Sequence, residues 1–230
     1  MTAEPAAVVV VHRDDEIVVV DKPSGLCVHP NRGTDRYALL HQVRDAVGQY
    51  VWPVHRLDRA TSGPVVFALS KETAGRLGTA FGRGLVTKTY GAIVRGWPDP
   101  SGRIDAPLAP EDREGPPQPA VTDYHRERTW ELPLPVTRYP TSRYALVRLH
   151  PRTGRTHQLR RHLAHVRHPI VGDVRHGEGR HNRVFRERFG VHRLLLWCTE
   201  LTLPHPTDAD ALTVRVAPAL EVADLLATLG

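Results

Sequence analysis

Residues 54–63 read Val-His-Arg-Leu-Asp-Arg-Ala-Thr-Ser-Gly and precede an apolar run at 64–69 that is typical of a buried strand. The only carboxylate in this motif is Asp58, and three side chains that carry or can acquire positive charge lie close to it in the sequence: His55, Arg56 and Arg59. Neighbouring cations favour the ionised form of a carboxyl group, so we expect Asp58 to be an anion at neutral pH, able to act as a nucleophile or to hold one cation. From this motif alone a second interpretation stays open, in which Asp58 caps a turn and the arginines point into solvent.

The size and hydropathy of the chain are those of a globular protein. Its 230 residues, 40% of them hydrophobic, are enough for one large domain or two closely packed subdomains. The longest apolar runs, such as 8–11 and 17–20, are far shorter than the ~20 residues of a membrane helix, and the first residues lack a cationic, apolar signal sequence. Cys27 and Cys198 have no Cys-x-x-Cys partner, which argues against a disulfide framework and a thiolate metal site. We therefore expect a cytoplasmic protein.

The positive charge is concentrated in one segment. The chain has 31 Lys and Arg against 25 Asp and Glu, a formal charge of +6. Residues 143–193 contain 13 arginines, no lysine and three acids, so this segment carries +10 and the remainder −4. A general preference for arginine, 28 against three lysines over the whole chain, explains the choice of Arg over Lys but not the scarcity of acids here. We expect a surface that faces phosphate groups, and hence a polyanionic partner.

The periodicity of apolar residues predicts a mixed structure. Strands are expected at 8–12, 16–21, 64–69, 87–95, 144–149, 193–203 and 212–216, and helices at 35–47, 71–83 and 220–229. Residues 22–25, Lys-Pro-Ser-Gly, predict a turn, and five prolines between 107 and 119 predict a surface loop or a subdomain crossover near 107–120. Strands outnumber helices and many connections are short, so we expect an α/β fold of the α+β type, with a mixed, largely antiparallel sheet and flanking helices. No glycine-rich phosphate loop follows a strand, and we expect no nucleotide cofactor.

A second motif begins with a predicted helix. Thr153 or Thr156 can cap its first turn, and its buried face is formed by Leu159, Leu163 and Val166. Arg155 precedes Leu159 by four residues, so we expect it to project toward the same side. A cation held near the core needs an acid, and the leading candidate is Asp58.

The polar face of this helix allows two functional interpretations. Arg160 and Arg167, seven residues apart and flanked by Arg161 and His168, form a candidate contact for phosphate, the alternative being a merely solvated face. Four histidines in the same stretch suggest zinc: His157, His162, His165 and His168. We expect no metal there, because neighbouring arginines repel a dication and no Cys or carboxylate within the run completes a ligand set.

The motif around Asp58 resembles the catalytic motif of a known enzyme family. His55-Arg56-Leu57-Asp58, two further residues and Thr61-Ser62-Gly63 match every fixed position in the pattern of the large ribosomal and transfer RNA pseudouridine synthase family. The resemblance implies an isomerase whose Asp is the nucleophile that converts a uridine of RNA to pseudouridine without metal or cofactor. It also implies that the base is flipped out of the RNA and that Arg56 fills the space left behind. Attack on the sugar C1′, attack on the base C6 and a glycal route all stay open.

Three further motifs extend the resemblance over residues 8–216. The stretch 154–173 is similar to the family's second motif, whose Arg, here Arg155, pairs with the catalytic Asp. Lys88-Thr89-Tyr90 matches a Lys-x-Tyr motif whose Tyr lies against the target base, which is compatible with a packing role, and 21–25 matches an early Lys-Pro-x-Gly turn. Together with the arginine-rich helix, the resemblance predicts three catalytic residues: Asp58, Tyr90 and Arg155. The residues expected to bind substrate are His55, Arg56, Arg59, Thr61, Lys88, Arg160, Arg161 and Arg167.

Within the family the chain is similar to the branch that acts on the uridine at position 65 of transfer RNA. The similarity rests on 115–122, 138–144 and 176–190, although Leu196-Trp197-Cys198 stands where that branch has Leu-His-Ala. The implied protein is a single pseudouridine synthase catalytic domain over residues 1–230 without a separate N-terminal RNA-binding module, and we expect a monomer. Three alternatives stay open: the same chemistry on ribosomal RNA, a non-catalytic RNA-binding protein, and a hydrolase with Ser62 as nucleophile, which lacks the Gly-x-Ser-x-Gly elbow.

Overall fold

The computed structural model describes residues 8–30, 37–111 and 113–230, which form two compact units. Unit 1 comprises Met1–Val86 and Thr199–Ala217, and unit 2 comprises Thr87–Cys198 and Pro218–Gly230. The proline-rich stretch at 107–120 lies within unit 2. In the described part of the chain, no helix has the length and apolar character needed to cross a membrane.

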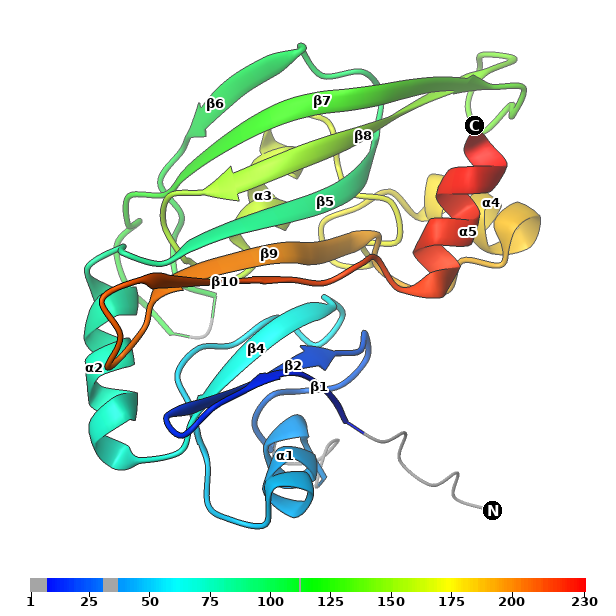
Figure 1. The fold of residues 1–230 in the computed structure, drawn as a ribbon. Helices are drawn as coiled ribbons and strands as arrows, with labels where there is room; N and C mark the ends of the chain where they lie inside the picture. The colour runs from blue at the N-terminus through cyan, green and yellow to red at the C-terminus, as the bar shows by residue number, and fades with distance from the viewer. Residues whose placement is uncertain (1–7, 31–36, 112) are drawn as a thin grey trace. The chain divides into compact units, whose positions relative to one another are not determined.

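Unit 1 is built on a four-stranded antiparallel sheet (Figure 1). Its strands lie in the order β1 (Val9–Arg13), β2 (Ile17–Lys22), β4 (Gly63–Ala68) and β3 (Trp52–Pro53). The two central strands, β2 and β4, carry nearly continuous buried runs, as expected of strands covered on both faces. Two helices complete this part of the chain, α1 (Leu39–Val47) and α2 (Lys71–Gly82). The Ser70 hydroxyl accepts the Thr73 N–H at 3.0 Å and caps α2.

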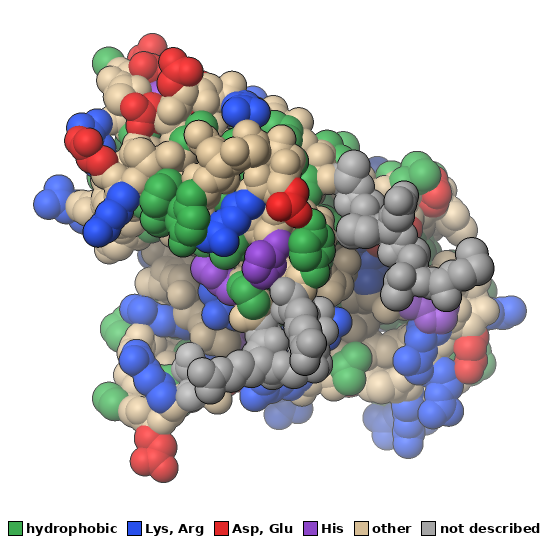
Figure 2. Space-filling view, turned by 90° about the horizontal axis from the view of Figure 1, so that it is seen from below, with side chains coloured by type: hydrophobic (Ala, Val, Ile, Leu, Met, Phe, Trp, Pro, Cys, Tyr) green, Lys and Arg blue, Asp and Glu red, His purple; other side chains and the backbone are tan. Residues whose placement is uncertain are grey.

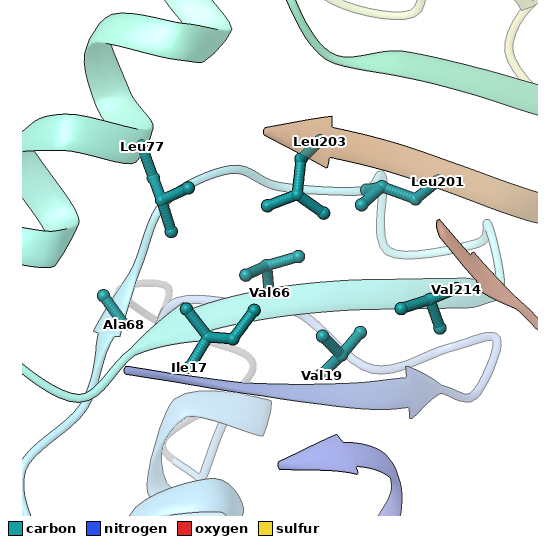
Figure 3. Packing of buried hydrophobic residues seen from close by; sticks show 8 residues of the cluster. All are labelled: Ile17, Val19, Val66, Ala68, Leu77, Leu201, Leu203 and Val214. Carbon is teal, nitrogen blue, oxygen red and sulfur yellow. The ribbon is translucent and has the colours of Figure 1, made fainter. Parts of the chain in front are cut away.

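The core of unit 1 joins segments that are far apart in the sequence. Side chains from β2, β4 and α2 pack against Leu201 and Leu203 of β9 (Leu196–Pro204) and Val214 of β10 (Ala211–Arg215) (Figure 3). On β2, Ile17 and Val19 share a face because strand side chains alternate, and both point into this cluster. Complete burial of one such side chain contributes about 1.5–3 kcal/mol. The antiparallel pair β9 and β10 supplies three of them and is therefore an integral part of unit 1.

Unit 2 contains a second antiparallel sheet (Figure 1). Four strands lie in the order β5 (Thr87–Arg95), β8 (Ser142–Pro151), β7 (Val121–Leu132) and β6 (Ser101–Asp105), and the first residues of β9 lie beside β5. Three helices complete the unit: α3 (Gln158–His165), α4 (Gly179–Phe189) and α5 (Leu220–Leu229). The Trp130 indole N–H donates to the carbonyl oxygen of Gly230 at 3.3 Å and ties the residue that follows α5 to β7.

The predicted fold class, an α+β structure with largely antiparallel sheets and flanking helices, is confirmed. Three elements are not predicted from the apolar pattern: β6, β7 and α4. They contain few apolar residues among many polar and charged ones, so they show no clear apolar periodicity. The pattern also places the start of α3 too early: α3 begins at Gln158, and His157 before it has a left-handed φ of 53° and no side-chain cap, so neither threonine caps this helix. The predicted start of the first helix at Asp35 lies outside the described residues, and α1 begins at Leu39.

Candidate active site

Asp58 lies in a tight turn that leads into β4. The Thr61 N–H donates to the Asp58 carbonyl oxygen at 3.0 Å, which closes the turn over residues 58–61. Leu57 and Thr61 are buried, Asp58 is half-buried, and the two arginines of the motif, Arg56 and Arg59, are exposed. Asp58 therefore does occupy a turn, as the second interpretation of the motif predicts. This turn fixes the backbone that carries the carboxylate.

The side chain of Lys22 anchors the Asp58 turn. Lys22 is fully buried at the end of β2, and its ammonium group donates at 2.9, 2.8 and 3.1 Å to the carbonyl oxygens of Pro23, Leu26 and Arg59. The Gly25 N–H also donates to the Arg59 carbonyl at 2.8 Å, and the Ser24 hydroxyl donates to the Ala60 carbonyl at 2.8 Å. The sequence predicts a turn at 22–25, but only the structure reveals that this turn holds the backbone next to Asp58.

Replacing Lys22 with Met is expected to lower the free energy of unfolding by about 2–3 kcal/mol. The thioether fills a similar volume, but the carbonyl oxygens of Pro23, Leu26 and Arg59 lose the fully buried ammonium donor, and hydrogen bonds to a charged group contribute about 1.5–3 kcal/mol. Urea unfolding measures the change. Lys71→Met, at the exposed first residue of α2, is the control, and equal urea midpoints for the two variants would contradict the anchoring role.

His55 and Thr61, two of the predicted substrate contacts, are built into unit 1. His55 Nε2 accepts the Val66 N–H at 3.0 Å, and its ring stacks on Phe81 with centroids 4.8 Å apart. Thr61 is buried, and within the described residues its hydroxyl has no hydrogen-bond partner. Ser62, the alternative hydrolase nucleophile, is buried as well, which does not favour attack on a substrate.

Tyr90 lies in β5, opposite Leu149 of β8, and is buried. The next residue, Gly91, lies directly against Trp197: a Cβ atom built on Gly91 would be 2.6 Å from the indole ring. Only glycine fits at this position. Trp197, which stands where the similar transfer RNA branch has His, therefore packs on the strand that carries Tyr90. Two residues earlier, burial lowers the pKa of the Lys88 ammonium group below its ordinary value, an effect that Cys198 partly offsets.

Arg155 is exposed and lies in a turn that Gln158 fixes. The Gln158 side-chain oxygen accepts from the Arg155 N–H at 3.1 Å and from the Thr153 hydroxyl at 2.7 Å, while its amide group donates to the Val121 carbonyl at 3.0 Å. Arg155 Nε donates to the Pro119 carbonyl at 3.1 Å. Sequence reasoning gives Gln158 no role, although it stands inside the second motif. Because Asp58 lies in unit 1 and Arg155 in unit 2, their pairing stays a prediction.

Arg160 is not on a phosphate-facing surface, contrary to the prediction from helix spacing. Its guanidinium group forms a bidentate ion pair with Asp173, at 2.7 and 2.9 Å, and the two side chains are only 10% and 1% exposed. Burial alone would raise the pKa of Asp173, but hydrogen bonds from Arg160 and from the backbone N–H groups of His176 and Arg175 outweigh it and lower the pKa. Arg160 is therefore an internal structural cation.

The other residues predicted to form a polar face with Arg160 do not form one continuous helix face. Arg167 follows the end of α3 with a left-handed φ of 64°, so it does not share a helix face with Arg160. Arg161 donates to the Ala109 carbonyl at 2.8 Å. Of the four histidines considered for zinc, His162 is fully buried, bonded at 3.0 Å to both Thr122 Oγ1 and the Ala106 carbonyl, and burial lowers its pKa.

The basic segment 143–193 is less positive in space than its sequence indicates. Several of its arginines pair with acids from outside the segment: Arg143 with Glu131, Arg148 with Glu127, Arg152 with Asp123 and Arg193 with Glu221. The exposed arginines of α4 have no acid partner within the described residues; they are Arg180, Arg183, Arg186 and Arg188. Figure 2 shows Lys and Arg side chains at several places on the face it presents, with a group of them at its lower right.

Comparison with known proteins points to one family. Residues 16–165 match the sequence profile described as RNA pseudouridylate synthase. Relatives named tRNA pseudouridine synthase C align over most of both chains. The relative from Vibrio parahaemolyticus is 43% identical over 225 residues, 93% of this chain and 91% of its own. The relative from Pasteurella multocida is 42% identical over 231 residues, 94% of each.

Solved structures agree with this match. Human RNA pseudouridylate synthase domain containing 1 is 27% identical, with a TM-score of 0.73 over 94% of this chain and 86% of its own. Human RNA pseudouridylate synthase domain containing 4 is 25% identical, with a TM-score of 0.76 over 96% of this chain and 92% of its own. Sequence profile, relatives and folds therefore agree.

Proposed function

The chain belongs to the RNA pseudouridylate synthase family and is an isomerase, and from this premise we propose that it converts a uridine of transfer RNA, at position 65, to pseudouridine. One observation carries the choice of substrate. The identity of 43% to a tRNA pseudouridine synthase C extends over 225 residues and nine-tenths of both chains, so it includes the regions outside the catalytic motif. A cytoplasmic location and a monomeric state stay predictions.

In this proposal Asp58 is the nucleophile. The closed turn at 58–61 and the buried Lys22 anchor support the role, because a nucleophile works best from a fixed backbone position. The reaction breaks the bond between the sugar C1′ and N1 of uracil, the base rotates, and a bond forms between C1′ and C5. A proton leaves C5, and N1 gains one, so the product is an isomer of the substrate. Attack on C1′, attack on C6 and a glycal route remain alternatives.

Tyr90 and Arg155 have supporting roles in the same proposal. Arg155 pairs with Asp58 and keeps the carboxylate charged and oriented, while Tyr90 lies against the flipped base. Arg56 and Arg59, both exposed, are suited to the RNA backbone or to the space that the base leaves.

In this proposal α4 contributes more of the RNA-contacting surface than α3 does. The arginines of α4 are exposed and have no acid partner in the part of the chain that the structure describes, whereas Arg160 is buried with Asp173. We therefore retain the exposed Arg167 and the half-buried Arg161 as candidate contacts, leave Arg160 out, and add the four α4 arginines that the sequence alone did not single out.

The double variant Arg183→Gln/Arg186→Gln is expected to bind transfer RNA more weakly and with less dependence on salt. Each lost phosphate contact lowers the slope of log K against log salt by about 0.9, so the slope should fall by up to about 2. Fluorescence anisotropy across a potassium chloride series measures it. Arg103→Gln/Arg215→Gln removes the same charge from arginines that pair with Asp123 and Glu200, and equal slopes for both double variants would contradict a contact on α4.

The substrate is tested with unmodified transfer RNA labelled with tritium at C5 of its uridines. Formation of the C1′–C5 bond releases this tritium to water, so release counts pseudouridine directly. We expect one equivalent from a transcript with uridine at position 65 and none after its replacement with cytidine. Release from ribosomal RNA but not from transfer RNA would support the isomerisation and contradict transfer RNA as the substrate.

A further inference from the structure

Three potential metal ligands converge in unit 2. They come from separate places in the chain: Glu111 lies between β6 and β7, His157 directly precedes α3, and His176 lies between α3 and α4. Glu111 Oε2 is 2.9 Å from His157 Nδ1, and Glu111 Oε1 is 3.3 Å from His176 Nε2. The two imidazole nitrogens are themselves 3.3 Å apart. The three side chains are 13–18% exposed, so the group is reachable but shielded.

The two imidazole nitrogens are spaced like neighbouring ligands of a coordination tetrahedron, and the Glu111 carboxylate lies beside both. Zinc binds histidine nitrogen and carboxylate oxygen at about 2.0–2.2 Å, so neighbouring ligands of a tetrahedral site are about 3.3–3.5 Å apart. The separation of 3.3 Å between His157 Nδ1 and His176 Nε2 has this value. The two Glu111 contacts, at 2.9 and 3.3 Å, are made through different carboxylate oxygens, so the carboxylate would bind the ion through one oxygen after a small rotation or through both. A tetrahedral ion bound by the two imidazoles and one carboxylate oxygen would keep its fourth position open for water.

We propose that Glu111, His157 and His176 bind one transition-metal dication of the Zn²⁺, Ni²⁺ and Cu²⁺ class. Two imidazoles and one carboxylate suit these ions, whereas Mg²⁺ prefers a set made of oxygens. The site is separate from the isomerisation, which the family resemblance describes as metal-free, and it does not rest on the choice of transfer RNA. Sequence reasoning discounted zinc because the run 157–168 holds no carboxylate; Glu111, 46 residues before His157, supplies it.

The backbone around each ligand is held in place. Asp173 Oδ1 accepts the N–H groups of Arg175 and His176, each at 2.9 Å, and so fixes the turn that carries His176. The His157 carbonyl accepts the Arg161 N–H at 2.9 Å in the first turn of α3. The loop of Glu111 is closed by two backbone hydrogen bonds between Leu108 and Gln118, at 2.9 and 3.0 Å. Such support lowers the ordering cost of binding.

Two arginines compete with the metal for Glu111. Arg175 approaches Glu111 Oε2 at 3.1 Å, and Arg161 approaches Oε1 at 3.5 Å. Their charges oppose a dication and weaken the site. The Arg175 side chain is 59% exposed, so it can turn into water when the ion binds. The proposal therefore predicts that removing the Arg175 charge strengthens metal binding. If the three residues formed only an ion-pair network, this change would not produce tighter metal binding.

The test is calorimetric titration of the full, untagged, chelator-treated chain with zinc chloride, nickel chloride and magnesium chloride. We expect one equivalent of Zn²⁺ or Ni²⁺ and none of Mg²⁺. Glu111→Gln and His176→Ala should each weaken binding at least tenfold, and Arg175→Gln should tighten it. His165→Ala, an exposed histidine at the end of α3, is the matched control and should bind like the unchanged chain.

Two results would overturn the site: no binding of Zn²⁺ or Ni²⁺ by the unchanged chain, or binding that survives in both Glu111→Gln and His176→Ala. The first result does not depend on whether any variant folds. Circular dichroism and thermal melting of each metal-free variant distinguish a lost ligand from a lost fold. Tritium release in the presence of chelator measures the isomerisation separately, so failure of the metal site leaves the proposed function intact.

Discussion

Replacing Asp58 with Asn is expected to reduce pseudouridine formation at least roughly 1,000-fold while the chain stays folded and still binds RNA. The amide has nearly the size of the carboxylate but cannot form a covalent bond to the sugar or base as the anion does. The turn is kept, because its hydrogen bond uses the backbone carbonyl of residue 58. Tritium release measures the rate, and anisotropy with labelled transfer RNA measures binding.

The control for this variant is Asp15→Asn, an exposed carboxylate in the turn between β1 and β2 of the same unit. Its rate should equal that of the unchanged chain. If folded Asp58→Asn retained the rate of Asp15→Asn, another residue would have to be the nucleophile. If it lost RNA binding as well as activity, Asp58 would act mainly in binding.

Replacing Asp173 with Asn is expected to destabilise unit 2 more than any other single change considered for it. Removing one partner of a buried ion pair typically costs about 3–5 kcal/mol, because the remaining charge has no partner. Arg160 would be left in that position, with its side chain 10% exposed. For a chain of this size the loss corresponds to a fall in melting temperature of about 10 °C. Asp99→Asn, at an exposed position of the same unit, should melt like the unchanged chain.

The same ion pair predicts how stability depends on pH. The pKa of Asp173 is lower in the folded chain than its ordinary value of 3.8, so the folded state binds this proton more weakly than the unfolded state. The stabilisation is complete above the ordinary value and is lost as the pH falls through the lowered one. Urea unfolding at pH 7 and pH 3 should therefore show a smaller difference between the unchanged chain and Asp173→Asn at pH 3. An equal difference at both values would contradict the pair as its source.

The apolar periodicity predicts the fold class and the motif around Asp58 predicts the reaction, because both are local patterns in the sequence. Their limits are physical. The helix-face assignment of Arg160 and Arg167 assumes one continuous helix, but α3 ends at His165, and the acid that pairs with Arg160 lies thirteen residues further on. Summing charge over 143–193 also overestimates the field, because Glu127, Glu131 and Glu221 approach from outside that segment. Sequence spacing does not reveal such long-range partners.

Two further features could not be predicted for a related reason. Lys22 reads as an ordinary turn residue, since nothing near it in the sequence indicates that its ammonium group is fully buried against three carbonyl oxygens. Glu111, His157 and His176 lie outside the helices and strands and are brought together by the tertiary structure. Residues in loops and turns have no periodic sequence pattern that would predict this contact. Both features depend on tertiary structure.

The division of unit 1 into two stretches of chain has a consequence for how the protein is made on the ribosome. Leu201, Leu203 and Val214 belong to the same core as Ile17 and Val19, yet they are translated only after Thr87–Cys198 of unit 2. At a synthesis rate of about 5–20 residues per second, on the order of 10 s separates the Asp58 motif from the strands that complete its unit. During that interval the β2 and β4 core lacks its final strands, so the nascent chain carries its proposed nucleophile well before the unit around it can finish folding.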